Sequence, residues 1–157
     1  MQIVRFKTDT NMSYGALEGG DVVEYSGTPW GPFRRGRRRV PLNDVTARDL
    51  ASKGFWLRAK AFDTFCPLGP CIATAIDPDA VAVETFVNGD LRQSSSTKEL
   101  IFPAAEIVAR IAQVMTLLPG DVVATGTPAG AGPLEPGDRV EVRIEGIGRL
   151  KNTVVKL

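Results

Sequence analysis

Short apolar runs separated by turn residues dominate the first 25 positions of the chain. One run begins at residue 3, and two more cover residues 14–17 and 22–25. Glu-Gly-Gly-Asp stands between the last two runs, and these residue types are typical of a tight turn. The pattern predicts a small β unit over residues 2–25.

The periodic pattern breaks over residues 26–43. Ser-Gly-Thr-Pro-Trp-Gly-Pro-Phe at 26–33 is rich in residues that interrupt helices and strands, and five arginines follow within residues 34–39. We interpret this stretch as a linker. It divides the chain into a small N-terminal β domain with an Arg-rich linker, residues 1–40, and a larger domain, residues 41–157.

Helical and extended signals alternate in the next region. Asp44 to Lys53 can form two or three helical turns that end at Gly54, and residues 55–57 are expected to be extended. Residues 103–117 give the strongest helix prediction, since Pro103 suits a first helical position. The apolar side chains of this helix fall on one stripe, which predicts core packing: Ile107, Val108, Ile111, Val114 and Met115.

Elsewhere in the second half of the chain, the sequence pattern predicts strands. Asn-Gly at 88–89, between residues 81–87 and 90–93, is the strongest hairpin signal in the chain. Further strands are expected at 121–125, 139–145 and 149–155, and Pro-Gly-Asp precedes a strand twice, at 119–121 and 136–138. The predicted fold class is therefore α+β and β-rich.

Composition narrows the classes of function. The chain has 19 basic and 18 acidic side chains, so its net charge of +1 argues against a general polyanion binder. Residues 1–60 nevertheless carry 11 basic and 6 acidic groups, mostly because of the arginine run. That run could contact nucleic-acid phosphates, but no recognition helix lies nearby, and a solvated segment is the simpler interpretation. We expect no nucleic-acid partner.

The absence of histidine excludes several chemistries. Ser-His and Cys-His catalysis and His-ligated metals are all unavailable. Cys66 and Cys71 are expected to be reduced thiols of a cytoplasmic protein, because two cysteines rarely form a disulfide framework in a chain of this size. No signal-peptide pattern is present, and no apolar run approaches the ~18 residues of a membrane span.

Three features could carry chemistry. Asp44 and Arg48 stand at i and i+4, where they could share a helix face as a ligand-binding pair or form a plain surface ion pair. Lys60 follows an aromatic stretch, either as a partly buried functional amine or as a strand-end lysine reaching water. Residues 126–132 form a Gly-rich loop that could approach an anion or be an ordinary loop. We find no close carboxylate pair to complete a cation site around Asp44.

An ordered series of motifs adds a family resemblance. The series is Asn-Asp-Val-Thr-Ala-Arg-Asp-Leu at 43–50, Ala-Lys-Ala-Phe-Asp-Thr-Phe-Cys-Pro-Leu-Gly-Pro at 59–70, Val-Asn-Gly at 87–89, Ile-Phe-Pro at 101–103, Gln-Val-Met-Thr-Leu at 113–117 and Gly-Asp-Val-Val-Ala-Thr-Gly-Thr-Pro at 120–128. From about residue 42 to 157 the chain closely resembles the C-terminal part of the fumarylacetoacetate hydrolase family. Residues 1–40 resemble the small N-terminal domain of its bacterial members.

The resemblance implies a mixed β-roll catalytic domain, here incomplete, in a homodimer. It implies Mg²⁺ or Mn²⁺ and a small-molecule substrate, a 2-oxo acid or β-dicarbonyl compound, that undergoes C–C hydrolysis, decarboxylation or keto–enol isomerisation. In such chemistry a Lewis acid stabilises a developing enolate. No membrane is implied.

The matching positions imply individual roles. Asp44 corresponds to a metal-binding carboxylate, Arg48 to a substrate-binding arginine and Lys60 to the lysine that stabilises the enolate. Thr64 lies in the turn near the metal. Thr127, after Gly126, corresponds to the threonine that holds a substrate carboxylate.

The chain also departs from the family pattern. The Glu-x-Glu pair that supplies two of three metal carboxylates has no counterpart, and neither does the His-Glu pair that activates water. Two functions therefore stay open. The chain is either a metal-dependent hydrolase, isomerase or decarboxylase of this family, or a non-catalytic descendant that serves as a binding or subunit-interaction module.

Overall fold

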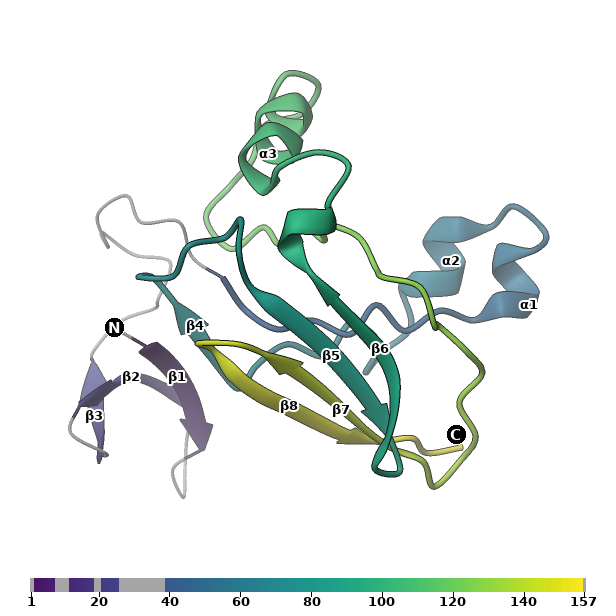
Figure 1. The fold of residues 1–157 in the computed structure, drawn as a ribbon, viewed down its shortest axis with the longest axis horizontal. Helices are drawn as coiled ribbons and strands as arrows, with labels where there is room; N and C mark the ends of the chain where they lie inside the picture. Colours follow the sequence, from purple (N-terminus) through teal and green to yellow (C-terminus); the bar gives the residue numbers. More distant parts are fainter. Residues whose placement is uncertain (1, 8–11, 19–20, 26–38, 157) are drawn as a thin grey trace.

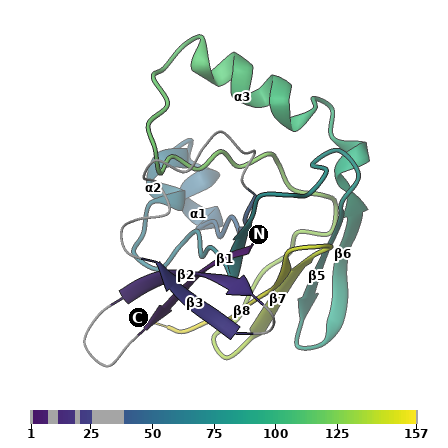
Figure 2. The ribbon, with the colours of Figure 1, turned by 90° about the vertical axis from the view of Figure 1, so that its left-hand side faces the viewer.

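The computed structural model describes residues 2–7, 12–18, 21–25 and 39–156. These residues form two four-stranded sheets and a few short helices (Figures 1 and 2). The sheets dominate and all their pairings are antiparallel, which confirms the α+β, β-rich fold class.

The first sheet contains the predicted N-terminal β unit and one strand that the sequence pattern missed. Its order is β3-β2-β1-β4, with strands β1 (Gln2–Lys7), β2 (Met12–Glu18), β3 (Asp21–Tyr25) and β4 (Cys71–Ala73). β4 is too short to show a period of two, and it forms because β1 pairs with it. The N-terminal unit is thereby joined to the rest of the chain.

The predicted linker is wrong for its last part. Residues 26–38, with most of the arginine run, lie outside the described residues. Arg39, however, exchanges two backbone hydrogen bonds with Ala73, at 2.8 and 2.7 Å, and Leu42 forms a β-bridge with Leu68. Pro41 between them is fully buried. Residues 39–42 are therefore part of the packed structure, because strand partners from residues 67–73 satisfy their backbone groups.

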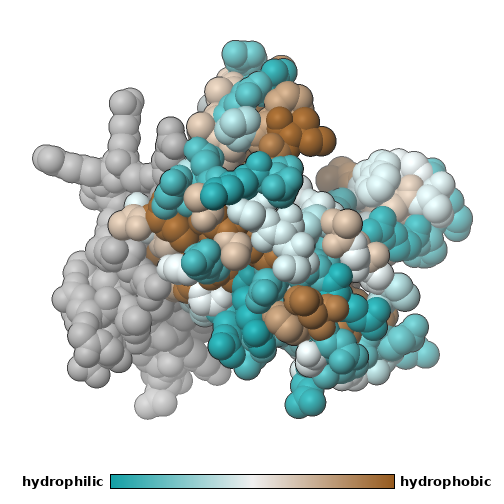
Figure 3. Space-filling view, in the orientation of Figure 1, coloured by the Kyte–Doolittle hydropathy of each residue, from teal (hydrophilic) through white to brown (hydrophobic). Residues whose placement is uncertain are grey.

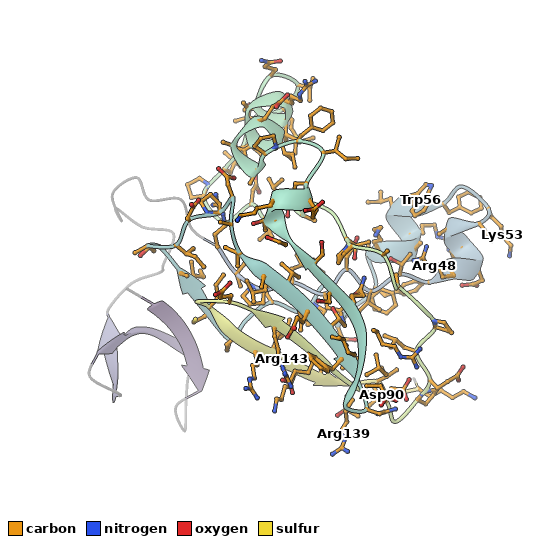
Figure 4. The ribbon with its side chains drawn as sticks, in the orientation of Figure 1. Arg48, Lys53, Trp56, Asp90, Arg139 and Arg143 are labelled. Atoms are coloured by element: carbon orange, nitrogen blue, oxygen red, sulfur yellow. The ribbon has the colours of Figure 1, made fainter. Side chains whose placement is uncertain are left out.

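The second sheet confirms the predicted hairpin and the two C-terminal strands. Its order is β6-β5-β7-β8, formed by β5 (Ala82–Val87), β6 (Asp90–Ser96), β7 (Arg139–Ile144) and β8 (Gly148–Thr153). Asn88 and Gly89 have φ values of 55° and 95°, as a type I′ turn requires. Val87, Val140, Val142 and Leu150 are buried on one face, while Arg143 and its ion-pair partner Glu141 lie on the other (Figure 4).

Two predictions between residues 44 and 60 are wrong. Only one helical turn forms, α1 (Arg48–Ala51), so Asp44 precedes the helix and shares no helical face with Arg48. Residues 56 and 57 are helical, because α2 (Trp56–Lys60) begins there, and Lys60 ends a helix instead of a strand. The nitrogen of Ala59 donates to the Phe55 carbonyl at 2.9 Å. Aromatic residues that favour strands are thus held in a helix by local hydrogen bonds.

The helix predicted at residues 103–117 is shorter than expected, and the strand predicted at residues 121–125 does not form. A 3₁₀ turn, η1 (Thr97–Glu99), precedes α3 (Ala104–Ala112), which ends five residues before the predicted residue 117. The stripe is not all core, since Val108, Val114 and Met115 are 41%, 82% and 58% exposed, and apolar surface lies beside α3 (Figure 3). Residues 121–125 form no strand and pair with no strand of the described chain.

The two Pro-Gly-Asp sequences form the same turn. Gly120 and Gly137 have φ values of 104° and 96°, which suit the third position of a type II turn. Asp121 Oδ2 accepts from the Leu118 nitrogen at 2.8 Å, and Asp138 Oδ2 accepts from the Glu135 nitrogen at the same distance. Both turns are thereby closed by a carboxylate.

We expect the Asp138 turn to confer acid sensitivity. The Glu135 N–H and the Asn88 amide donate to Asp138 and hold the pKa of its carboxyl below the usual value. A lowered folded-state pKa adds stability above the unfolded pKa, near 4, which is lost as the pH falls through the folded value. The free energy of unfolding of Asp138→Asn, measured by urea denaturation, should therefore depend less on pH below about pH 4 than that of the wild type.

Both cysteines are free thiols, as predicted, with Cys66 exposed and Cys71 buried. Among the described residues, none of the helices has the length and apolarity needed to cross a bilayer.

Candidate functional site

The candidate site begins where residues 43–47 run beside the end of α2. The Asn43 nitrogen donates to the Pro67 carbonyl at 3.2 Å, and the Ala47 nitrogen donates to the Ala59 carbonyl at 2.9 Å. The Ala59 side chain is fully buried. These bonds fix Asp44 and Lys60 on neighbouring stretches of backbone, although they are 16 positions apart.

Lys60 is the centre of a small polar cluster. Its Nζ forms a short ion pair with Asp44 Oδ2 and donates to Thr46 Oγ1 at 3.1 Å. The Trp56 ring lies 6.0 Å from the same nitrogen, within cation–π range. The Lys60 and Asp44 side chains are 36% and 41% exposed, so the pair is open to solvent and to a ligand.

The loop 61–70 places a thiol beside this pair. The pKa of the Cys66 thiol is raised, first by burial and then by the negative charge of Asp44, while Lys60 acts in the opposite direction. Thr64 has a φ of 68°, which is unusual for a β-branched residue. Backbone strain of this kind is often found at functional sites.

A cavity of about 410 Å³ lies between the second sheet and the segment after α3. Its walls are mainly apolar and come from both sides, with Val83, Val142 and Ile144 on the sheet and Val122 and Val123 opposite. Its polar lining includes Arg39, Asn43, Asp44, Thr85, Gln93, Asp121 and Thr127. This size and lining suit a small molecule that carries a few polar groups.

The Gly-rich loop forms one rim of the cavity. The Gln93 amide nitrogen donates to the Pro128 carbonyl at 2.8 Å and lies 3.5 Å from Thr127 Oγ1. Gly126 has a φ of 120°, which favours glycine and exposes backbone N–H groups. In the described part of the chain, the N–H groups of Gly126 and Thr127 have no hydrogen-bond partner, so they can donate to an anion.

The structure brings most of the predicted site residues together. Asp44, Gly126 and Thr127 line the same cavity. Lys60 is not part of the lining but is hydrogen-bonded to Asp44. Arg48 is exposed on α1, away from the cavity lining (Figure 4).

Gln93 lines the cavity although the sequence analysis did not name it, and Arg39 lines it although it was named only as part of the arginine run. Alternation along the predicted hairpin, counted from the turn, places Gln93 on the outer face. A β-bulge between Thr85 and Phe86 shifts that register, so simple alternation from the turn points to the wrong face.

The residues present do not fit the divalent cation that the resemblance implies. Such a cation takes about six oxygen ligands, usually with carboxylates among them. The described residues contain no group of three acidic, cysteine or histidine side chains that could hold a metal ion. Of the two carboxylates that line the cavity, Asp44 and Asp121, Asp44 is already paired with Lys60.

Comparison with known families gives two matches. The profile described as "Fumarylacetoacetate (FAA) hydrolase C-terminal" matches residues 39–155. A second profile, "Rv2993c-like, N-terminal", matches residues 1–46. Together the two matches cover almost the whole chain.

Relatives with similar sequences include named enzymes. The uncharacterized protein MJ1656 of Methanocaldococcus jannaschii is 57% identical over 114 residues, which are 72% of this chain and 48% of that protein. The oxaloacetate tautomerase YisK of Bacillus subtilis is 41% identical over 125 residues, which are 72% of this chain and 41% of that enzyme. The chain therefore spans about half the length of the curated relatives that it matches.

Solved structures agree with these matches. A 5-carboxymethyl-2-hydroxymuconate delta-isomerase from Mycobacterium smegmatis is 53% identical with a TM-score of 0.72, over 74% of this chain and 47% of that chain. A maleylpyruvate hydrolase from Sphingobium sp. SYK-6, solved with manganese(II) and pyruvate, is 44% identical with a TM-score of 0.60, over 62% of this chain and 38% of that chain.

Proposed function

The chain belongs to the fumarylacetoacetate hydrolase family, and on that basis we propose that it binds a 2-oxo acid in the cavity and catalyses its keto–enol isomerisation. The observation that carries the proposal is the shared cavity. Asp44 and Thr127 lie 83 positions apart in the sequence, yet both line it, and Lys60 is bonded to Asp44.

The two ends of a 2-oxo acid would contact different parts of the lining. Thr127 Oγ1 and the N–H groups of Gly126 and Thr127 are donors suited to the carboxylate end. Lys60 supplies a positive charge for the oxygen of the keto group, where negative charge develops as the enolate forms. Asp44 keeps its second carboxylate oxygen available to accept the proton that leaves the neighbouring carbon and to return it to the enolate oxygen.

Isomerisation fits these residues better than C–C hydrolysis does. Hydrolysis needs a base for an attacking water molecule, whereas the base proposed here, Asp44, serves the substrate's own proton. Isomerisation moves one proton within the substrate and needs no second reactant. Among the relatives, the oxaloacetate tautomerase carries out a reaction of this class by name.

The direct test is binding and turnover with simple ligands. Oxalate resembles the planar enolate of a 2-oxo acid, and calorimetry should detect its binding to the full chain. The enol form of oxaloacetate absorbs ultraviolet light, so its conversion to the keto form can be followed spectroscopically. We expect the chain to bind oxalate and to accelerate this conversion above the rate in buffer.

Replacement of Thr127 should weaken the binding. Thr127→Val removes one hydroxyl donor at unchanged volume, which should reduce oxalate affinity about tenfold. Thr116→Val, at an exposed threonine outside the cavity lining, is the matched control and should bind as the wild type does. If the wild type neither binds oxalate nor converts oxaloacetate, the proposal is wrong and a non-catalytic binding module is the better description.

The proposal keeps two further expectations. A homodimer in the cytoplasm is implied by the family resemblance, and light scattering of the purified chain measures the oligomeric state.

A further inference from the structure

The residues around the Asp44 carboxylate do not suit the divalent cation that the family resemblance implies. A divalent cation there would take about six oxygen ligands, usually with one or two free carboxylates among them. Instead Asp44 Oδ2 forms an ion pair with Lys60 Nζ, and the described part of the chain offers no acidic group of three to complete a metal site. A positive charge nevertheless lies at this position, on the ammonium group itself.

Lys60 is held in place firmly enough to act as a fixed charge. Its Nζ donates to Asp44 and Thr46, and the backbone bond between Ala47 and Ala59 fixes the two segments that carry these groups. An ammonium group has three donors. The two acceptors named here use two of them, and the third is available to a ligand.

Charge balance also requires Lys60 for the binding of an anion. The unpaired carboxylate of Asp44 would repel an incoming carboxylate at the cavity wall. Lys60 neutralises that charge, and the two other charged groups of the lining, Arg39 and Asp121, are of opposite sign.

We propose that the Lys60 ammonium takes the place of the family's divalent cation, so that this chain binds a 2-oxo acid or its planar dianionic analogue without metal. This inference rests on the proposed function, because it assumes that the ligand occupies the cavity beside Asp44. A compact ammonium group can donate to the keto oxygen at the point where a cation would otherwise be.

The test measures oxalate binding to the full chain after metal removal. The wild type is treated with EDTA, desalted into metal-free buffer and titrated with oxalate by calorimetry, and the titration is repeated in millimolar MnCl₂. We expect equal affinity in both buffers. Lys60→Met should lower the affinity about tenfold or more in the metal-free buffer, and Lys60→Arg, which keeps the charge, should retain part of it.

A matched control separates the local effect from overall charge. Lys53→Met removes one positive charge from the exposed end of the α1 turn and should leave oxalate affinity unchanged (Figure 4). Circular dichroism of each variant shows whether it has folded, and if Lys60→Met does not fold, Lys60→Arg and the metal comparison still decide the question.

The outcomes distinguish the two proposals. Binding in metal-free buffer that is weakened by loss of the Lys60 charge supports the inference. Binding only in the presence of manganese would overturn it while leaving the proposed function intact. An absence of binding in both buffers would overturn both.

Discussion

Gly130→Ala should destabilise the protein by about 3 kcal/mol and detach the Gly-rich loop from the second sheet. Gly130 has a φ of 97°, and a Cβ built on it would lie 2.0 Å from the carbonyl oxygen of Arg92 in β6. Since real contacts of this kind are never so short, the loop backbone has to move. Backbone strain at the positive φ adds to the cost.

The displacement should also be visible at the site. Gly130 packs on β6 next to Gln93, whose side chain holds the Pro128 carbonyl at 2.8 Å. A loop pushed away from Arg92 would therefore carry Thr127 away from the cavity and reduce oxalate binding. Urea denaturation measures the loss of stability, and calorimetry measures the loss of affinity.

Gly132→Ala is the matched control for this prediction. Gly132 lies two residues away in the same loop, has no heavy atom within 4 Å of a built Cβ and does not have the positive φ of Gly130. We expect its stability and oxalate affinity to equal those of the wild type. Equal stability of Gly130→Ala and Gly132→Ala would show that the loop does not pack on β6.

Ala59→Leu should separate the two halves of the Asp44–Lys60 pair. The Ala59 side chain is fully buried, and its backbone carbonyl accepts from the Ala47 nitrogen at 2.9 Å. Three additional carbon atoms cannot fit at this fully buried position without a shift of α2. Overpacking of this kind costs about 1–3 kcal/mol. Because the pair depends on that contact, oxalate binding should fall together with the free energy of unfolding.

The control for this second variant is Ala61→Leu. Ala61 directly follows Lys60 and is exposed, so a larger side chain meets no packed neighbour. Its thermal midpoint should stay within a degree or two of the wild-type value, whereas that of Ala59→Leu should fall by several degrees. Similar midpoints for the two variants would contradict the tight contact between Ala59 and residues 43–47.

Local chemistry alone was enough to predict the turns and the long strands. Asn88 and Gly89 adopt the positive φ values that the hairpin requires, and Val140 and Val142 of β7, which alternate with charged residues, are buried on one face. These features depend on neighbours in the sequence, so the sequence pattern contains them. The motif series that predicted the family also depends on residue identity and order, and the profile match over residues 39–155 confirms it.

Structural features that depend on partners far away in the sequence could not be predicted from local sequence patterns. β4 is a strand because β1 lies beside it, and residues 121–125 form no strand because no described strand pairs with them, although their pattern is that of a strand. Asp44 and Lys60 meet because Ala47 bonds to Ala59 across two short helical turns. The residue types of the candidate site were therefore present in the sequence. Their assembly around one cavity, with Lys60 bonded to Asp44, follows from long-range backbone pairing, which no local pattern encodes.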